Sequence, residues 1–189
     1  MTEARQITLP LTEAALQSLR AGDMVELSGV LYTARDAAHA RLCRLLDEGR
    51  PLPIDLKGVC LYYAGPCPAA PGEVLGSCGP TTSSRMDAYT PRLVDEGQTA
   101  MIGKGKRSPA VTEALRGRAV YFAAPGGAGY LIAQCIRSSE VAAFPELGTE
   151  AIRRLTVERL PAVVAVDAFG GDVYRQKDPA CQRSPDGLL

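Results

Sequence analysis

Short apolar segments alternate with helical patterns along most of this chain of 189 residues. The apolar segments at 58–65, 100–103 and 119–127 have the length of strands, and each of them ends in glycine. Between and around them lie amphipathic helical patterns, among which 35–48 and 110–117 are the clearest. This alternation is typical of a sheet flanked by helices, so the predicted fold class is α/β.

Capping residues mark where two of the expected helices begin. Thr12 precedes the helical pattern at 12–20 as an N-cap, and Gly22 follows that pattern as a stop signal. Ser108 is placed to cap a helix whose first turn starts with Pro109, a position at which proline is favoured. Both helices are therefore predicted together with their starting points.

The other segments complete the predicted organisation of one domain. Residues 22–33 are predicted as a bent strand or a strand pair, because apolar residues alternate around a glycine. Residues 160–174 are predicted as a buried strand that turns at two glycines. Further helical pieces are predicted at 81–89, 129–137 and 149–155. The domain is expected to span residues 1–174, with a polar tail at 175–189.

Charge and hydropathy exclude several classes of partner. The chain has 21 Lys and Arg against 21 Asp and Glu, so its formal net charge is zero. A neutral chain lacks the basic footprint that nucleic acids and anionic membranes require. No apolar run approaches the roughly 20 residues that span a bilayer, and the first residues lack the pattern of a secretory signal. We expect a cytoplasmic protein that contacts neither nucleic acid nor membrane.

The six cysteines are expected to be free thiols. Without a secretory signal, disulfides are disfavoured, and no CxxC pair is present to suggest a zinc ribbon or a redox motif. Cys60, Cys67 and Cys78 lie close together in the sequence, which leaves a metal or cluster site as an alternative. Their spacing matches no metal signature, so this chain is predicted to ligate no metal.

Basic residues follow three of the predicted strands, in the segments RDAAH, TTSSR and GKGK. Arg35, Arg85 and Lys104 therefore stand near strand-to-helix turns, where α/β proteins collect ligand groups. Arginine there can bind a carboxylate with two parallel hydrogen bonds. We infer a site for a small anion with more than one acidic group. Neither a Walker A loop nor a dinucleotide fingerprint is present.

A rigid loop leads to one of these basic segments. Residues 65–80 contain four Gly and four Pro, a composition that permits close approach to a ligand or to another backbone, and that also suits a plain surface linker. The only histidine, His39, could be a structural residue or a functional one. A hydrolase triad is hard to build from one histidine without a GxSxG motif.

Several motifs in this order carry a family resemblance: TARDAAH, GPTTSSRMD, IGKGKR, PGGAGYLIA and ELGTEAIRRL. The chain resembles, over roughly residues 7–174, the β subunit or C-terminal β domain of iron–sulfur hydro-lyases, namely class I fumarate hydratase and L(+)-tartrate dehydratase. The resemblance implies a single swivelling-type β/β/α domain with a mixed sheet flanked by helices. It also implies a [4Fe–4S] cluster whose cysteine ligands belong to an α partner and not to this chain.

The resemblance also implies roles for individual residues. Arg35, Arg85 and Lys104 would bind the carboxylates of a small dicarboxylate substrate, and Thr81 would shuttle a proton. His39 would serve in acid–base work or orient Arg35. We further expect Asp36 and Asp87 to hold arginines or cap helices, and Gly79 and Pro80 to fix the loop that presents the threonine.

Three functional hypotheses follow. The leading one is the β subunit of a two-subunit fumarate hydratase, active only with its cluster-bearing α subunit, in an α2β2 assembly with homodimeric contacts. The second is the β subunit of L(+)-tartrate dehydratase or of another dicarboxylate hydratase. The third, from a different class, is a non-catalytic anion-binding module.

Overall fold

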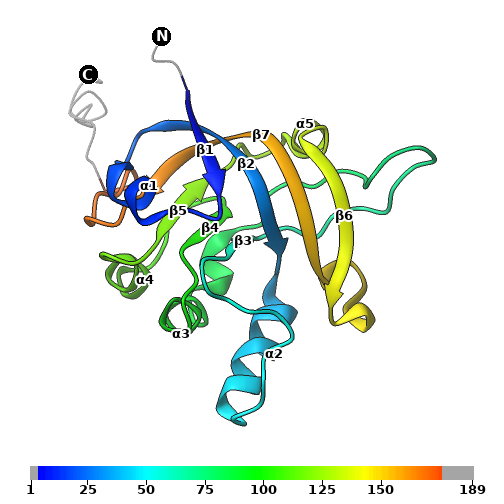
Figure 1. The fold of residues 1–189 in the computed structure, drawn as a ribbon, viewed down its shortest axis with the longest axis horizontal. Helices are drawn as coiled ribbons and strands as arrows, with labels where there is room; N and C mark the ends of the chain where they lie inside the picture. The colour runs from blue at the N-terminus through cyan, green and yellow to red at the C-terminus, as the bar shows by residue number, and fades with distance from the viewer. Residues whose placement is uncertain (1–3, 176–189) are drawn as a thin grey trace, which may run out of the picture.

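A computed structural model describes residues 4–175 of the chain (Figure 1). All but the first residue of the predicted tail at 175–189, including Cys181, lies outside the described residues. The seven strands are β1 (Arg5–Leu9), β2 (Met24–Thr33), β3 (Cys60–Tyr62), β4 (Ala100–Gly103), β5 (Val120–Ala123), β6 (Ile136–Ala143) and β7 (Ile152–Val166). The α-helices are α1 (Glu13–Ser18), α2 (Asp36–Asp47), α3 (Thr90–Asp95), α4 (Pro109–Leu115) and α5 (Gly129–Ala133). Two 3-10 helices, η1 (Ser83–Met86) and η2 (Pro145–Glu150), complete the fold.

The sheet is mixed and closes on itself. β2, β3, β4 and β5 pair in parallel in that order. β7 pairs antiparallel with both β5 and β2, so these five strands form a ring. β1 extends β2 in parallel, and β6 extends β7 antiparallel. The predicted α/β class with a mixed sheet is confirmed.

The central strands are buried on both faces, which explains their continuous apolar sequences. Tyr62, Ile102 and Phe122 belong to the core inside the ring, together with residues of β2 and β7. Their neighbours along β3, β4 and β5 point the other way, into a second core under α2, α3 and α4. These three helices lie together along one side of the sheet in Figure 1.

The predicted helix starts at Thr12 and Ser108 are confirmed. The Thr12 hydroxyl accepts a hydrogen bond from Ala15 N–H at 3.1 Å, and the Ser108 hydroxyl accepts one from Val111 N–H at 3.4 Å. The strand at 100–103 is confirmed residue for residue, and β2 covers residues 24–33 of the predicted 22–33 as one bent strand. The bend coincides with a register shift in the pairing with β7.

Three predicted helices are wrong or too long. Residues 149–155 enter β7, residues 129–137 are helical only to Ala133 before β6 begins, and residues 81–89 form a 3-10 turn rather than an α-helix. β1 and β6 were not expected at all. Irregular pairing explains the errors at β6 and β7, because bulges interrupt the alternation of buried and exposed residues on which strand prediction depends.

Within residues 4–175, none of the helices combines the length and the apolar character that crossing a membrane demands.

Candidate functional site

The carboxyl ends of β2, β3 and β4 meet at one edge of the sheet, because these strands are parallel neighbours. Arg35 follows β2 and begins α2, while Lys104 follows β4 directly. Thr81 is reached from β3 through the loop at 65–80. The structure therefore brings three of the predicted site residues to the edge where α/β sheets bind ligands.

Backbone hydrogen bonds hold Thr81 beside Lys104. Thr81 N–H donates to the Tyr63 carbonyl at 2.6 Å, and Lys104 N–H donates to the Thr81 carbonyl at 3.3 Å. Ser83 N–H then donates to the Lys104 carbonyl at 2.9 Å. Residues 81–83 thus run alongside the end of β4 as a short parallel bridge. The long loop returns to the sheet to present the threonine.

Gly103 makes this close approach possible. A methyl group on its Cα would overlap the Ser83 hydroxyl and come within 2.9 Å of the Tyr63 ring. The glycine that precedes Lys104 is therefore required for packing, because any larger residue would push residues 81–83 away from the strand.

One carboxylate links the two arginines. Arg85 Nε donates to Asp36 Oδ1 at 2.8 Å, and Arg35 Nη2 lies 3.8 Å from Asp36 Oδ2. Arg35 Nη2 also lies 3.4 Å from Glu150 Oε1 of η2. The expectation that Asp36 holds an arginine is confirmed. The arginines of α2 and η1 consequently stand next to each other, although 50 positions separate them in the sequence.

Unpaired polar atoms mark this arginine pair as incomplete. Arg35 Nε and Asp36 Oδ2 are buried and have no hydrogen-bond partner among residues 4–175. Arg85 uses only its Nε atom in hydrogen bonds within the same residues. A buried donor without an acceptor is costly, and an anionic ligand would relieve that cost. Figure 1 shows α2 starting close to the end of β2, and Arg35 and Asp36 are the N-cap and the first residue of that helix.

His39 lies beneath this edge and not at its surface. Its side chain is fully buried, and Nδ1 is 2.8 Å from the Arg35 carbonyl oxygen. Since a carbonyl can only accept, Nδ1 is assigned the proton, and Nε2 is left without a partner among the described residues. Burial lowers the pKa of His39 to about 4. The ring is therefore neutral at pH 7, and the geometry favours orienting Arg35 over acid–base work.

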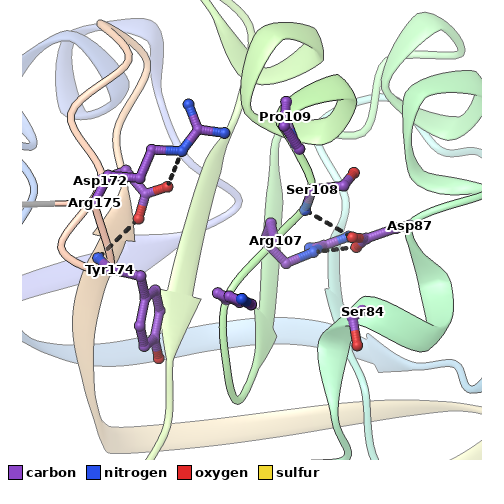
Figure 2. A pocket seen from close by; sticks show the side chains of 9 residues that line it. Ser84, Asp87, Arg107, Ser108, Pro109, Asp172, Tyr174 and Arg175 are labelled. Atoms are coloured by element: carbon purple, nitrogen blue, oxygen red, sulfur yellow. Dashed lines mark hydrogen bonds and ion pairs between the residues drawn. The ribbon is translucent and has the colours of Figure 1, made fainter.

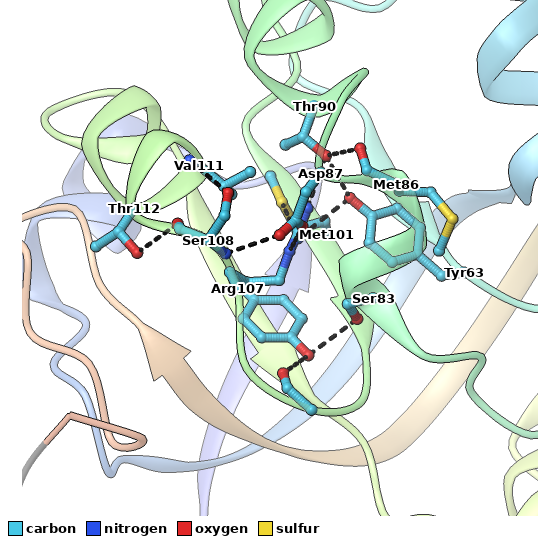
Figure 3. Close-up of polar contacts among 12 residues, drawn as sticks. Tyr63, Ser83, Met86, Asp87, Thr90, Met101, Arg107, Ser108, Val111 and Thr112 are labelled. Atoms are coloured by element: carbon cyan, nitrogen blue, oxygen red, sulfur yellow. Dashed lines mark hydrogen bonds and ion pairs between the residues drawn. The ribbon is translucent and has the colours of Figure 1, made fainter.

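Arg107 is a buried residue that the sequence analysis did not single out. Its Nε donates to Asp87 Oδ1 at 2.7 Å and its Nη2 donates to Thr90 Oγ1 at 2.7 Å, as Figure 3 shows. The guanidinium also lies 5.3 Å from the centre of the Tyr63 ring and 5.1 Å from that of Tyr121. The expectation for Asp87 is confirmed, but for an arginine other than those predicted to bind substrate. The only sequence signal for Arg107 is its position directly after the GKGK segment.

The same network ties the segment that carries Arg85 to the loop that carries Lys104. Tyr121 OH donates to the Gly105 carbonyl at 2.7 Å and lies 3.0 Å from Ser83 Oγ. Together with the Arg107–Asp87 pair, which Figure 3 labels, these bonds connect the segment that carries Arg85 with the loop that carries Lys104. Buried networks with every member bonded rigidify the groups that they connect.

A cavity of about 440 Å³ lies beside this network and outside the predicted site. Figure 2 shows Arg107 and Asp87 on one wall, with Asp172, Tyr174 and Arg175 on the other. None of the five predicted site residues lines it. Because the Arg107 guanidinium is already paired with Asp87, it offers this cavity little free charge.

Comparison with known proteins decides the family. The family model described as "Fumarase C-terminus" matches residues 1–177. The chain belongs to this family. The recognition of the chain from its motifs as a relative of class I fumarate hydratase and of the tartrate dehydratase β subunit is thereby confirmed.

Two relatives of the fumarase C-terminus family are much longer than the region that matches this chain. It is 40% identical to the anaerobic class I fumarate hydratase of Escherichia coli over 166 residues, which are 86% of this chain and 30% of that protein. It is 40% identical to fumarate hydratase 2 of Leishmania major, over 81% of this chain and 28% of that one. The chain therefore spans about 30% of the length of these hydratases.

A third relative has almost the same extent as this chain. A Methanocaldococcus jannaschii protein with the provisional name L(+)-tartrate dehydratase subunit beta is 35% identical over 88% of this chain and 89% of its own length. Members of the fumarase C-terminus family therefore occur both inside longer hydratases and as separate chains named as subunits.

The cysteines that this family member places within residues 4–175 were considered as ligands for a metal or cluster. Among residues 4–175, no three His, Cys, Asp or Glu side chains are placed to hold a metal ion. Cys67 is exposed, whereas Cys60 and Cys78 are buried, and burial raises the pKa of both thiols, that of Cys78 to about 12. Thiols that stay protonated are poor ligands. The alternative of a cluster on these three cysteines finds no support in the described residues.

Proposed function

We propose that this chain is the β subunit of a two-subunit hydro-lyase that interconverts fumarate and malate. Its family membership and the separate β-subunit relative support the division into two chains. The residues at the carboxyl edge support a dianionic substrate, because they place several cations at one edge of the sheet. A companion chain, corresponding to the part of the fumarate hydratases that the present sequence does not match, completes the enzyme.

The single observation that carries the proposal is the incomplete arginine pair beside Thr81 and Lys104. Asp36 and Glu150 orient the two guanidiniums without satisfying them. Lys104 is exposed and has no ion pair within residues 4–175. Three cations with unused donors suit a molecule that carries two carboxylates.

The chemistry of hydration explains why these residue types are needed. Removal of the proton next to a carboxylate transfers negative charge onto that carboxylate. Arg35, Arg85 and Lys104 stabilise this charge, because fixed cations interact most strongly with the state in which charge has accumulated. Thr81 relays the proton. Its hydroxyl is a weak base, so a carboxylate of the companion chain accepts the proton in turn.

The [4Fe–4S] cluster belongs to the companion chain in this proposal. The described residues do not fit a cluster, since they offer no set of three suitable ligands. When bound in the companion, the cluster supplies a Lewis acid for the substrate hydroxyl. This chain contributes the carboxylate-binding cations and the proton relay.

The proposal is tested by anaerobic co-expression with the companion chain and measurement of fumarate loss by its ultraviolet absorbance. Arg85→Ala is expected to lower kcat/KM more than 100-fold while the complex still assembles. Arg92→Ala is the matched control, because its side chain is equally exposed, at 49%, and also pairs with carboxylates. Normal turnover by the Arg85→Ala complex would refute the assignment.

L(+)-tartrate dehydration is the second candidate. It is favoured by the M. jannaschii relative, which matches this chain over nearly its whole length. The same complex is assayed with fumarate, malate and L(+)-tartrate side by side. Turnover of tartrate alone would select the second candidate. Binding of dicarboxylates without turnover of any of them would select the non-catalytic anion-binding module.

A further inference from the structure

Large apolar side chains are exposed on one face of the molecule, around the loop at 65–80. Tyr130 and Leu131 of α5 are 63% and 67% exposed, and Val74 of the loop and Val141 of β6 are about half exposed. We call these four residues the loop–α5 face. Helix α5 buries Gly129 and Ile132 and packs Ala133 partly against the core, which leaves Tyr130 and Leu131 largely exposed. Apolar patches of this kind mark protein–protein contacts.

Two hollows make this face continuous. One, of about 330 Å³, lies between the loop and α5, where Val74, Leu75 and Tyr130 line it together with the polar side chains of Glu73, Gln134 and Arg137. The other, of about 400 Å³, lies between the loop and β6 and is lined by Val74, Leu75 and Val141. Because both share the same two loop residues, the surface extends without a break from α5 to β6. In Figure 1 the loop projects from the fold on the side where α5 and β6 lie.

The loop that forms part of this face is held in place by hydrogen bonds, and its two ends reach the candidate site. Across the loop, Cys67 N–H donates a hydrogen bond to the Ser77 carbonyl at 2.9 Å. Cys78 N–H donates one to the Gly129 carbonyl of α5 at 3.0 Å. At one end of the loop, a methyl group on Gly65 would come within 3.0 Å of Arg35 Nη1. At its other end the loop passes into Thr81. Both ends of the loop therefore lie beside residues of the candidate site.

Arg153 shows what charge the occupant presents. It lines the hollow between loop and β6, and its Nε is buried without a hydrogen-bond partner among residues 4–175. No ion pair within those residues involves this guanidinium. Its neighbour Arg154, in contrast, pairs with Glu140 at 3.2 Å. An apolar groove with one unsatisfied guanidinium fits an apolar segment that carries a carboxylate.

We propose that the loop–α5 face is the docking surface for the companion chain, with a carboxylate of that chain bound to Arg153. The lengths of the relatives indicate this occupant. The chain spans about 30% of the fumarate hydratases, and a relative of its own length is named a subunit. Docking here would close the carboxyl edge against water. The inference rests on the proposed function and adds to it the surface through which the two chains meet.

The test uses the companion chain encoded in the same genome, recognised as the polypeptide that matches the remaining part of the fumarate hydratases. The dissociation constant of the complex is measured anaerobically by sedimentation. Leu131→Asp is expected to raise it at least tenfold, because a charge would be placed in the apolar interface. Phe169→Asp is the matched control, since Phe169 is 48% exposed and stacks on Arg20, away from this face, so it should leave the constant unchanged.

A second pair of variants tests the carboxylate contact. Arg153→Gln is expected to weaken the complex several-fold, whereas Arg154→Gln should not. Thermal unfolding of each free variant checks that the fold is intact. Wild-type affinity of the Leu131→Asp chain, or failure of the wild-type chain to bind the companion, would overturn the proposal. So would a self-association of this chain that Leu131→Asp abolishes while companion binding persists.

The failure of this inference is distinguishable from failure of the proposed function. A wild-type complex that forms and is disrupted by Leu131→Asp, but that hydrates no dicarboxylate, would retain the docking surface and refute the activity. A Leu131→Asp complex with normal affinity and normal fumarate turnover would refute the docking surface and retain the activity.

Discussion

The neutral, buried His39 makes the stability of this protein depend on pH in a defined window. The ordinary pKa of a histidine is about 6.5, and burial lowers that of His39 to about 4. The unfolded chain therefore takes up a proton as the pH falls below 6.5, while the folded chain resists it until about pH 4. The contribution to stability is complete above pH 6.5 and is lost as the pH falls toward 4.

The magnitude follows from the size of the shift. Each pKa unit corresponds to about 1.4 kcal/mol, so the full contribution is about 3 kcal/mol, of which about 2 kcal/mol is lost between pH 6.5 and pH 5. The free energy of unfolding is measured in urea across this range for the wild-type chain and for His39→Phe. Carboxylates titrate in both proteins, so their effect cancels when the two free energies of unfolding are subtracted. The difference between the wild type and His39→Phe should therefore fall by about 2 kcal/mol between pH 6.5 and pH 5.

Nuclear magnetic resonance gives an independent reading. His39 is the only histidine in the sequence, so its imidazole signal is unambiguous. The midpoint of the His39 titration in the folded chain is expected near pH 4. A midpoint near 6.5, or parallel stability curves for the wild type and His39→Phe, would refute the reasoning and would return the ring to the list of acid–base candidates near neutral pH.

Three further changes test the packing that holds the site. Arg107→Met should lower the free energy of unfolding by about 3–5 kcal/mol in urea, because Asp87 loses its buried partner, and the added change Asp87→Asn should recover part of that loss; no recovery would mean that packing and not charge is responsible. Gly103→Ala should cost about 1–3 kcal/mol and reduce turnover, because the added methyl overlaps Ser83; unchanged melting and activity would contradict this. Ser108→Ala should cost about 1 kcal/mol by removing the cap of α4, with no change in KM, and a changed KM would show that the cap also shapes the site.

Several features of the fold and of the candidate site were predicted from the sequence, each from a different kind of signal. Local patterns identified the parallel strands, since β3, β4 and β5 are short apolar runs bounded by turn residues. Motif order identified the family, and the position of basic residues after strands indicated the anion site. The strands and the family are confirmed, because their signal is carried by residues adjacent in the chain, whereas the anion site stays a prediction.

Other features required the tertiary structure. β6 and β7 pair through bulged ladders with each other and with β2, so no simple alternation appears in their sequences. The pairing of β7 with β2 closes the ring, and no local pattern encodes a contact between segments so far apart.

The positions of the charged residues were likewise determined partly by the sequence and partly by the tertiary structure. The sequence alone determined that Arg35, Arg85, Lys104 and Thr81 occur in segments that follow strands. Only the tertiary structure decided that Asp36 joins the two arginines. It also decided which charges are buried. A side chain stays in water unless other elements cover it and satisfy its hydrogen bonds, and those elements come from distant parts of the chain.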